Sequence, residues 1–266
     1  MFSIVVSTKR DIEALRPLFV VSSDESEMII IDSDYNEETK KQLKEIEHDF
    51  YSLTYAPPRS EKKYKRDHII CMNTGFAYAE NEWIIKLDDS SELKPDFFEI
   101  VKQDIKLANE KFDYKNLVLR IVKLEEWSGH KKWEMHPSLK KSKYDFYFID
   151  RNGIDGMFRT LDSAVFRRDG IDLLNGYDER YDIGHGYDDN DAYQRFLTAR
   201  YWIILDRGLM LFQKKHNVKK DYIDFTKILF DMTMREILNG KYKAYNDFDM
   251  KELRSELLCE KDKYKL

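Results

Sequence analysis

The sequence contains little cysteine, proline or glycine. Its 266 residues include 2 cysteines, 5 prolines and 10 glycines. Cys71 and Cys259 are too few and too distant for a disulfide framework or a zinc motif, and they fit core thiols in a reducing compartment. So few prolines and glycines argue against long disordered or repetitive regions. A chain of this length is therefore expected to bury a sizeable core.

Long hydrophobic runs are also absent. No apolar run approaches the roughly 18 residues that a membrane-spanning helix needs. The segment Met1–Ser7 lacks the basic lead and small-residue cleavage site of a signal peptide, and it is typical of a buried first strand. The formal net charge of −5 gives no general nucleic-acid footprint. We predict a cytoplasmic protein with no nucleic-acid partner and no transmembrane segment, and peripheral membrane contact stays open.

Short apolar runs alternate with amphipathic stretches along the chain. The pattern predicts strands at 2–7, 27–32, 50–55, 83–87, 116–124, 144–150, 201–205 and 208–212. It predicts helices at 37–48, 67–79, from Pro95 onward, at 188–198 and in the tail after Lys219. Strands separated by helices favour an α/β fold with a mixed, mainly parallel sheet flanked by helices. Ligands of such sheets bind beyond the carboxyl ends of the strands.

Carboxylates gather at two places that suit a ligand site. Asp88 and Asp89 follow the apolar run 83–87, and adjacent carboxylates there can hold a divalent ion against phosphates or simply form a solvated turn. Asp188, Asp189 and Asp191 open a helix after a loop with two glycines. One aspartate is enough to cap a helix, so three in four positions favour an additional role such as a general base.

Three further residues each allow two interpretations. Asp32 closes the strand 27–32, where it could accept hydrogen bonds from a nucleobase or ribose, or belong to a turn. His216 could complete a carboxylate metal site or be a surface residue. His185 could contact an acceptor or be an ordinary loop residue.

In order and spacing, these segments resemble GT-A glycosyltransferases, close to the inverting family 2 pattern. The segment 2–8 resembles the first nucleotide-binding strand, and 27–33 resembles the second, whose terminal aspartate contacts the base. The segment 73–96 is similar to the stretch from an Asn-x-Gly helix into the metal-binding acidic motif. Ser90 departs from this motif, where a third aspartate is usual. Two smaller departures are Met72 in place of an arginine and Ser33 in place of a second aspartate.

The segment 175–191 resembles the carboxy-terminal part of galactosyltransferase-like members. There an Asn/Gly-Gly-Phe/Tyr-Asp-Glu segment leads into Gly-x-Gly-x-Glu/Asp-Asp and a helix. Asp189 matches the catalytic base and Asp188 the acceptor-binding residue beside it. His216 stands where such members often place a metal-binding histidine after the next strands.

The resemblance implies a metal-dependent, inverting transfer of a sugar from a nucleotide-diphosphate sugar to an acceptor hydroxyl, with a UDP-sugar as the expected donor. The implied nucleotide-binding residues are Thr8, Asp32, Arg66, Asn73 and Asp88. Asp89 and His216 are the implied ligands of Mn²⁺ or Mg²⁺, and Asp189 is the catalytic base.

On the acceptor side, a saccharide or other hydroxyl compound is expected to meet Asp188, His185 and Trp127. Trp127 belongs to the segment 127–137, which mixes aromatic and basic residues and fits either a lid or acceptor wall or a plain surface excursion.

The resemblance also predicts how the chain is organised. Residues 1–216 are expected to form the glycosyltransferase domain, with a nucleotide-binding part at 1–110 and an acceptor-binding and catalytic part at 111–216. Residues 217–266 are expected to form a helical extension, in which Phe225, Ile228, Leu229 and Met232 make an apolar stripe.

Two other classes of protein remain open from the sequence. A nucleotidyltransferase of related α/β fold would need a glycine- and basic-rich triphosphate loop, and Lys9-Arg10 without a nearby glycine is weak evidence for one. A non-catalytic carbohydrate-binding protein would have no need of Asp89 and Asp189 together.

Overall fold

The computed structural model describes residues 1–60, 66–111, 116–126, 129, 132–134, 139, 146–150, 159–184, 186–214 and 223–266. Three residues of the predicted site, Trp127, His185 and His216, lie outside the described residues.

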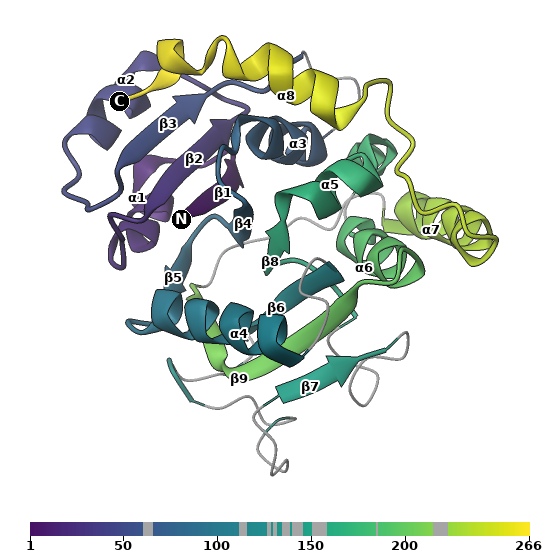
Figure 1. The fold of residues 1–266 in the computed structure, drawn as a ribbon. Helices are drawn as coiled ribbons and strands as arrows, with labels where there is room; N and C mark the ends of the chain where they lie inside the picture. The colour runs from purple at the N-terminus through teal and green to yellow at the C-terminus, as the bar shows by residue number, and fades with distance from the viewer. Residues whose placement is uncertain are drawn as a thin grey trace.

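One twisted sheet runs through the molecule (Figure 1). Its strands are β1 Phe2–Thr8, β2 Ser26–Asp32, β3 Ser52–Ala56, β4 Trp83–Asp88, β5 Ser91–Leu93, β6 Leu117–Glu125, β7 Phe146–Ile149, β8 Ala164–Arg167 and β9 Trp202–Gln213. The spatial order is β3-β2-β1-β4-β8-β6-β9-β5, with β7 also paired to β9. Strands β1 to β4 pair in parallel, β8 is antiparallel to β4 and β6, and β6 is parallel to β9. The predicted α/β class with a mixed sheet is confirmed.

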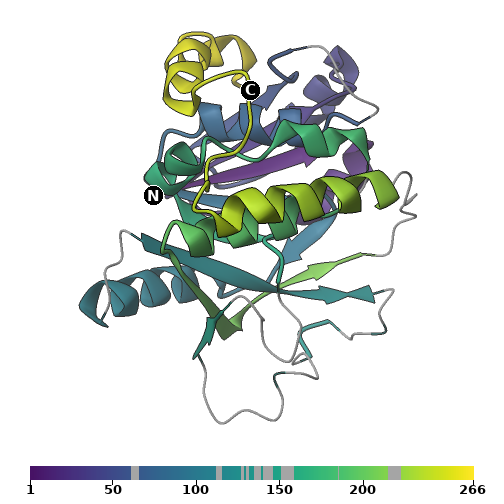
Figure 2. The same ribbon diagram turned by 90° about the vertical axis from the view of Figure 1, so that its right-hand side faces the viewer.

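The helices cover both faces of this sheet. They are α1 Ile12–Leu15, α2 Glu37–Lys44, α3 His68–Tyr78, α4 Phe97–Lys111, α5 Arg168–Leu174, α6 Asp188–Thr198, α7 Ile223–Leu238 and α8 Met250–Leu258. Figures 1 and 2 show α4 against β6 and β9, and α3 on the opposite side of the N-terminal strands, beneath α8. The predicted strands 201–205 and 208–212 are a single strand, β9, whose pairing with β6 shifts register between Arg120 and Val122.

Strand alternation divides the hydrophobic core in two. In β1, Val5 packs into one cluster with residues of α3, α5, α6 and α8, whereas Ile4 and Val6 pack into the other with residues of α1, α2 and α4. Successive side chains of a strand point to opposite faces, so a continuous apolar run such as β1 is typical of a strand covered on both sides.

Parallel register brings the predicted nucleotide-side residues to one edge. Thr8 lies opposite Asp32 at the ends of β1 and β2, and Ser7 lies opposite Asp88 at the end of β4. The carboxyl ends of three neighbouring parallel strands therefore meet where the sequence predicts the nucleotide site.

The predicted tail packs on the N-terminal half of the chain. Met250, Leu253 and Leu257 of α8 belong to the same core cluster as α3. Beyond α8, the buried ammonium of Lys261 pairs with the buried carboxylate of Glu27 on β2. The backbone N–H of Leu266 then donates to the carbonyl of Leu53 on β3 over 2.9 Å.

Most of the apolar stripe predicted on the tail faces outward and not toward the core. Phe225, Ile228 and Met232 of α7 are 55%, 59% and 60% exposed. The face of α7 that packs on the protein carries the buried Thr226, Thr233 and Ile237, together with the partly buried Leu229 and Phe230. Within the described residues, no helix combines the length and the apolar character that crossing a membrane requires.

A buried carboxyl pair between α4 and β9 gives a prediction about stability. Asp104 is 3% exposed and hydrogen-bonds to Asp206, and burial followed by the Asp206 charge raises its pKa to about 9. Because the folded-state pKa is the higher one, the contribution of Asp104 is complete below the unfolded pKa and is lost as pH rises through about 9. Asp104→Asn should therefore stabilise the protein by roughly 1–3 kcal/mol at pH 8–9 and have a smaller effect near pH 4. Thermal unfolding across this range tests it, and a pH-independent difference would contradict it.

Candidate active site

Asp88 and Asp89 stand at the end of the central strand β4, and the chain then turns through Ser90, whose φ is 60°. Oδ2 of Asp88 accepts from Nζ of Lys123 at 3.2 Å and from Nε2 of Gln213 at 3.4 Å. Burial works to raise the pKa of Asp88, but Lys123 and Lys86 outweigh it and lower the pKa. Asp88 is therefore held as a carboxylate.

Asp89 contacts the end of β1. Its Oδ2 accepts from Oγ1 of Thr8 at 3.0 Å and lies 3.2 Å from Nε of Arg10. Burial raises the pKa of Asp89 to about 6, although Arg10 opposes this. The carboxylate is thus short of positive charge, which is the electrostatic condition that a bound cation would relieve.

Asp32 sits across the strand ends from Thr8. It is 1% exposed, and its carboxylate accepts from the hydroxyl of Tyr55 at 2.7 Å and from the backbone N–H of Asp34 at 2.9 Å. The ring of Tyr55 stacks on Tyr35 with centroids 4.9 Å apart. Burial raises the pKa of Asp32. The structure therefore brings Thr8, Asp32, Asp88 and Asp89 together, as the sequence predicts.

The second acidic cluster begins α6. The chain enters this helix through two residues in the left-handed region, Gly186 with φ 87° and Tyr187 with φ 68°. The ring of Tyr187 stacks on Phe230 of α7 at 5.4 Å, which fixes this strained entry. Asp188 and Asp189 occupy the first turn, where the positive end of the helix dipole favours carboxylates.

Asp189 is tied to the nucleotide side of the site by a lysine. Its Oδ1 lies 2.9 Å from Nζ of Lys86, which belongs to the same strand as Asp88. Burial raises the pKa of Asp189 to about 6, Lys86 opposes this, and Asp188 adds to it. A carboxylate with this pKa is ionised at neutral pH and is a stronger base than an ordinary aspartate, as general-base catalysis requires.

A chain of charges continues from Asp88 into the centre of the molecule. Lys123 of β6 lies 2.6 Å from Asp162 as well as 3.2 Å from Asp88, and Arg120 lies 2.5 Å from Asp162. Burial works against the ionised form of Asp162, but Arg120 and Lys123 outweigh it and lower its pKa. These buried charges are paired, as the cost of an unpaired buried ion demands.

His68 begins α3 on the same side of the sheet. Its Nδ1 is 2.7 Å from the hydroxyl of Ser7, opposite Asp88. Burial, together with the positive charges of Arg66 and Lys86, lowers the pKa of His68 to about 4. The imidazole is neutral at physiological pH and can exchange hydrogen bonds with a ligand or with Ser7.

Two predicted nucleotide-binding residues take other contacts. Arg66 donates through Nη1 to the carbonyl of Gly184 at 3.1 Å, and its charge acts on Asp188 at the start of α6. Asn73 is fully buried, and its amide exchanges bonds of 2.9 Å with the backbone of Tyr177. Arg66 thus contacts the loop that leads into α6 and Asn73 fixes the backbone of Tyr177, and their nucleotide contacts stay predictions.

The backbone conformation of Asn175 and Gly176 holds the start of the segment 175–191 close to Asn73. Asn175 ends α5 in the left-handed region, and Gly176 follows with φ 76°. A Cβ on Gly176 would lie 2.5 Å from Oδ1 of Asn73 and from Cε of Met250. Only glycine allows the chain to pass so close while adopting this conformation.

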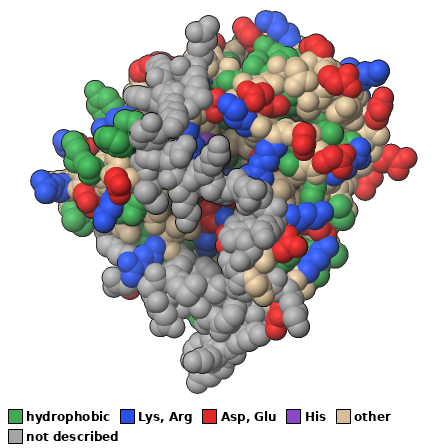
Figure 3. Space-filling view, turned by 180° about the vertical axis from the view of Figure 1, so that it is seen from behind, with side chains coloured by type: hydrophobic (Ala, Val, Ile, Leu, Met, Phe, Trp, Pro, Cys, Tyr) green, Lys and Arg blue, Asp and Glu red, His purple; other side chains and the backbone are tan. Residues whose placement is uncertain are grey.

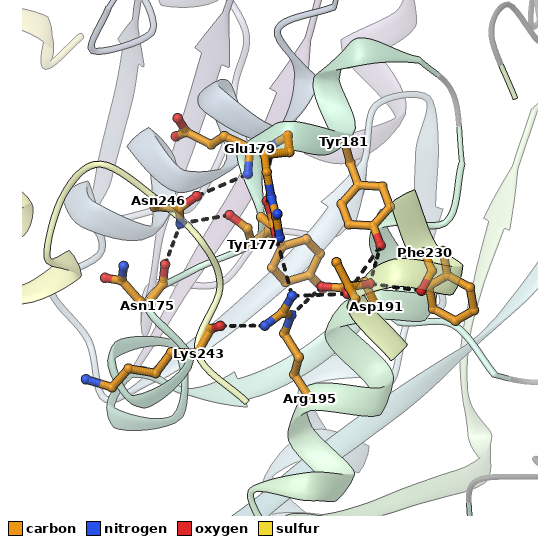
Figure 4. A network of polar contacts seen from close by, with 12 residues as sticks. Asn175, Tyr177, Glu179, Tyr181, Asp191, Arg195, Phe230, Lys243 and Asn246 are labelled. Carbon is orange, nitrogen blue, oxygen red and sulfur yellow. Dashed lines mark hydrogen bonds and ion pairs between the residues drawn. The ribbon is translucent and has the colours of Figure 1, made fainter. Parts of the chain in front are cut away.

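Asp178 and Asp191, also in the segment 175–191, belong to a structural network around Arg195, seen in Figure 4. Arg195 of α6 is 1% exposed and contacts the carboxylates of both Asp191 and Asp178. The hydroxyl of Tyr181 reaches Asp191 at 3.3 Å and Thr233 at 2.9 Å. Asp191 therefore fixes α6 against its neighbours, which separates it from Asp188 and Asp189.

The acidic residues also determine how a divalent cation would fit. Within the described part of the chain, no group of three or more His, Cys, Asp or Glu side chains could hold a metal. Mg²⁺ is commonly bound by one or two carboxylates together with substrate phosphates and water. Asp89, with Asp88 beside it, offers this minimal oxygen donor set, so the residues fit a cation completed by a diphosphate.

Charged side chains of both signs and a histidine line a hollow in the face shown in Figure 3. The basic partners Lys86, Arg120 and Lys123, together with His68 and Asp162, were missed by sequence reasoning. A signal for three of them exists, because charged residues inside the apolar runs 83–87 and 116–124 must be paired if those strands are buried.

Comparison with known proteins decides the family. The chain matches the family described as glycosyltransferase like family 2 over residues 12–252. It belongs to this family. The predicted identity as a glycosyltransferase enzyme is therefore confirmed.

Solved structures agree with this family 2 glycosyltransferase in fold. S. aureus TarS residues 1–349 in complex with UDP-GlcNAc has a TM-score of 0.60 at 15% identity, over 97% of this chain and 70% of that one. The same TarS region in complex with UDP has a TM-score of 0.62 at 15% identity, with the same coverage. A longer S. aureus TarS structure has a TM-score of 0.61 at 15% identity, over 97% of this chain and 42% of that one. No curated protein matches the sequence.

These similarities confirm the GT-A fold predicted for this family 2 glycosyltransferase. The match begins at residue 12 and extends to residue 252, so it includes α7 and ends within the first turn of α8. The galactosyltransferase-like interpretation of the segment 175–191 stays a prediction, as do the metal and the cytoplasmic location.

Proposed function

We propose that this glycosyltransferase moves a sugar from a UDP-sugar to an acceptor hydroxyl with inversion at the anomeric carbon. One observation carries the proposal. The carboxylate of Asp189 lies 2.9 Å from Lys86, on the strand that ends in Asp88 and Asp89. Lys86 therefore holds a candidate base on α6 close to the strand end that carries the candidate diphosphate site.

The nucleoside is proposed to sit at the carboxyl ends of β1 and β2. Thr8 and Asp32 lie opposite one another there, and Asp32 can accept hydrogen bonds from a base or ribose. The stacked rings of Tyr35 and Tyr55 lie beside Asp32. UDP and UDP-GlcNAc occupy the similar TarS structures, so UDP-GlcNAc is the first donor to test here.

Asp189 is proposed to take the proton of the attacking hydroxyl. The oxygen then forms the new bond to the anomeric carbon on the face opposite the diphosphate, and the electron pair of the broken bond leaves with UDP. Asp188, on the same turn, is proposed to bind the acceptor, and His185 and Trp127 are proposed to line the acceptor site. A divalent cation bound at Asp89, with His216 as a further ligand, would neutralise charge on the departing diphosphate.

Release of UDP tests the proposal directly. The protein is incubated with UDP-GlcNAc and other UDP-sugars with and without Mn²⁺, and free UDP is measured. Slow metal-stimulated hydrolysis without acceptor is expected, and a saccharide acceptor should accelerate it. Binding of a UDP-sugar without any UDP release would favour a carbohydrate-binding protein, whereas release of diphosphate from UTP would favour a nucleotidyltransferase.

A second prediction concerns the metal. Mn²⁺ should increase the affinity for UDP, and Asp89→Asn should weaken Mn²⁺ binding by roughly tenfold or more because a direct carboxylate ligand is lost. Titration of Mn²⁺ into the protein with UDP measures this, with Asp34→Asn as a control because Asp34 is 62% exposed. If UDP affinity does not depend on Mn²⁺ in wild type or in His216→Ala, the proposed ligand set is wrong.

A further inference from the structure

Lys86 is an unusual residue for the centre of a sheet. It is 0% exposed and belongs to β4, which pairs with β1 on one side and β8 on the other. Alternation along β4 puts its side chain on the same face as Ile84 and Asp88. Lysine is almost never fully buried unless its charge is paired, so a strong interaction must hold it there.

Three acceptors surround the ammonium group. Nζ donates to the carbonyl of Leu161 at 3.2 Å, to the carbonyl of Asp162 at 2.7 Å and to Oδ1 of Asp189 at 2.9 Å. An ammonium has three protons, so these acceptors use its full donor capacity. Of the three, only Asp189 carries a charge.

The same contacts join two parts of the acceptor side. The backbone N–H of Leu161 donates to the carbonyl of Asp189 at 3.3 Å. Lys86 therefore fastens the segment 159–163 and the first turn of α6 to one another and to β4. A lysine on the nucleotide-binding strand fixes the position of a residue that faces the acceptor.

We propose that Lys86 is a positioning residue that holds Asp189 in the orientation and the ionised state that proton abstraction from the acceptor requires. This inference rests on the proposed function, because it assumes that Asp189 is the base. It assigns Lys86 a role in catalysis through Asp189 and none in contact with the donor.

The surrounding charges show why Asp189 needs the positive charge of Lys86. Burial is the largest influence that raises its pKa, and Lys86 is the largest influence that lowers it. Burial works against the charged form of Lys86 as well, but its acidic neighbours raise its pKa, so it stays an ammonium. The other titratable groups that act on Asp189 or are acted on by it are Asp188 of α6, Asp162, Asp88 of β4, His68 of α3 and Tyr177. Three of these five are carboxylates, which favour its protonation.

The test is the pH dependence of kcat in Lys86→Gln. An opposite charge in contact with a carboxylate lowers the pKa of that carboxylate by about 1–3 units. Loss of the Lys86 charge should therefore move the acidic limb of the kcat profile to higher pH by about the same amount. Starting from a pKa of about 6, kcat at pH 7 should then fall roughly 2- to 90-fold and recover partly at higher pH. The KM for the UDP-sugar should change little.

Lys261→Gln is the matched control. Lys261 is also a buried lysine paired with a carboxylate, that of Glu27, and it lies outside the proposed site. It should lose stability without moving the pH profile. If Lys86→Gln does not fold, Lys86→Met, which has a similar volume, and Lys86→Arg, which keeps the charge, allow the same comparison.

The outcomes separate this inference from the proposed function. If Asp189→Asn abolishes turnover and Lys86→Gln lowers kcat equally at every pH, Lys86 is merely structural and the inference is overturned. Unchanged kcat in Lys86→Gln also overturns it. If Asp189→Asn retains turnover, the proposed function loses its base, whatever Lys86 does. A Lys86→Gln/Asp189→Asn double variant no slower than Asp189→Asn supports action through Asp189.

Discussion

Replacing Asp189 with asparagine should lower kcat by roughly 100- to 10,000-fold, which is the range of general-base assistance. Asparagine keeps an oxygen that can accept the bond from Lys86, but it cannot take a proton. Donor binding should survive, because the residues proposed to hold the nucleotide stand on β1, β2 and β4. Single-turnover rates and UDP affinity measured on the same preparation separate the two effects.

Asp188→Asn is the informative comparison for this variant. Asp188 lies on the same turn, so its replacement should raise the KM for the acceptor more than it lowers kcat. In wild type, kcat should rise with pH through about 6, because Asp189 becomes active as it loses its proton at that pKa. Wild-type turnover by a folded Asp189→Asn protein would show that another group is the base.

Arg195→Met should be the most destabilising of the substitutions considered, at about 3–5 kcal/mol of unfolding free energy. Arg195 is 1% exposed, and its guanidinium pairs with Asp178 and Asp191, which are each 1% exposed. Removing one member of a buried ion network leaves the others desolvated without a counterion. Nη1 of Arg195 also donates to the carbonyl of Lys243, so the variant loosens the chain that joins α7 to α8 (Figure 4).

Urea unfolding monitored by circular dichroism measures this loss, with Arg16→Met as the control. Arg16 also pairs with a carboxylate, that of Glu13, but both side chains are more than half exposed, at 56% and 70%. An exposed pair typically contributes about 0–1 kcal/mol. Equal losses in the two variants would mean that the buried network does not stabilise α6.

The fold was largely accessible to sequence reasoning because it depends on local periodicity. The runs 2–7, 27–32 and 83–87 each contain at least three consecutive apolar residues, so each predicts a strand wherever the rest of the chain lies. Strand β8 and helix α5 were missed, since four residues of strand leading directly into seven of helix are too few for either periodicity to stand out from its neighbours. The orientation of α7 was also not predictable, because Phe225, Ile228 and Met232 of its apolar stripe are exposed whereas its polar Thr226 and Thr233 are buried.

Only the acidic residues of the candidate site could be selected from the sequence. Aspartates at strand and helix ends stand out against apolar runs, so Asp32, Asp88, Asp89 and Asp189 could be selected from the sequence. Their basic partners could not be assigned, because Lys86 and Asp189 are separated by 103 residues and meet only once β4 and α6 pack.

The same limit applies to the residues whose contacts differ from the prediction. Asn73 is a polar residue on a helix that precedes the acidic motif, which fits nucleotide contact or a structural bond equally well. Its bonds to the backbone of Tyr177 depend on Gly176, which is 103 positions further along the chain. No local sequence pattern indicates that Asn73 and Gly176 lie in contact.

The packing of α8 and Lys261 on the first strands has a consequence for synthesis of the protein. Strands β1, β2 and β3 are synthesised before residues 250–266. Until those residues follow, Glu27 has no contact with Lys261, and α3 has no contact with the apolar face of α8. Domains commonly fold from the N-terminus as they emerge. Here β1, β2, β3 and α3 complete their packing only after residues 250–266 have been translated, so their exposure to chaperones and proteases lasts at least until then.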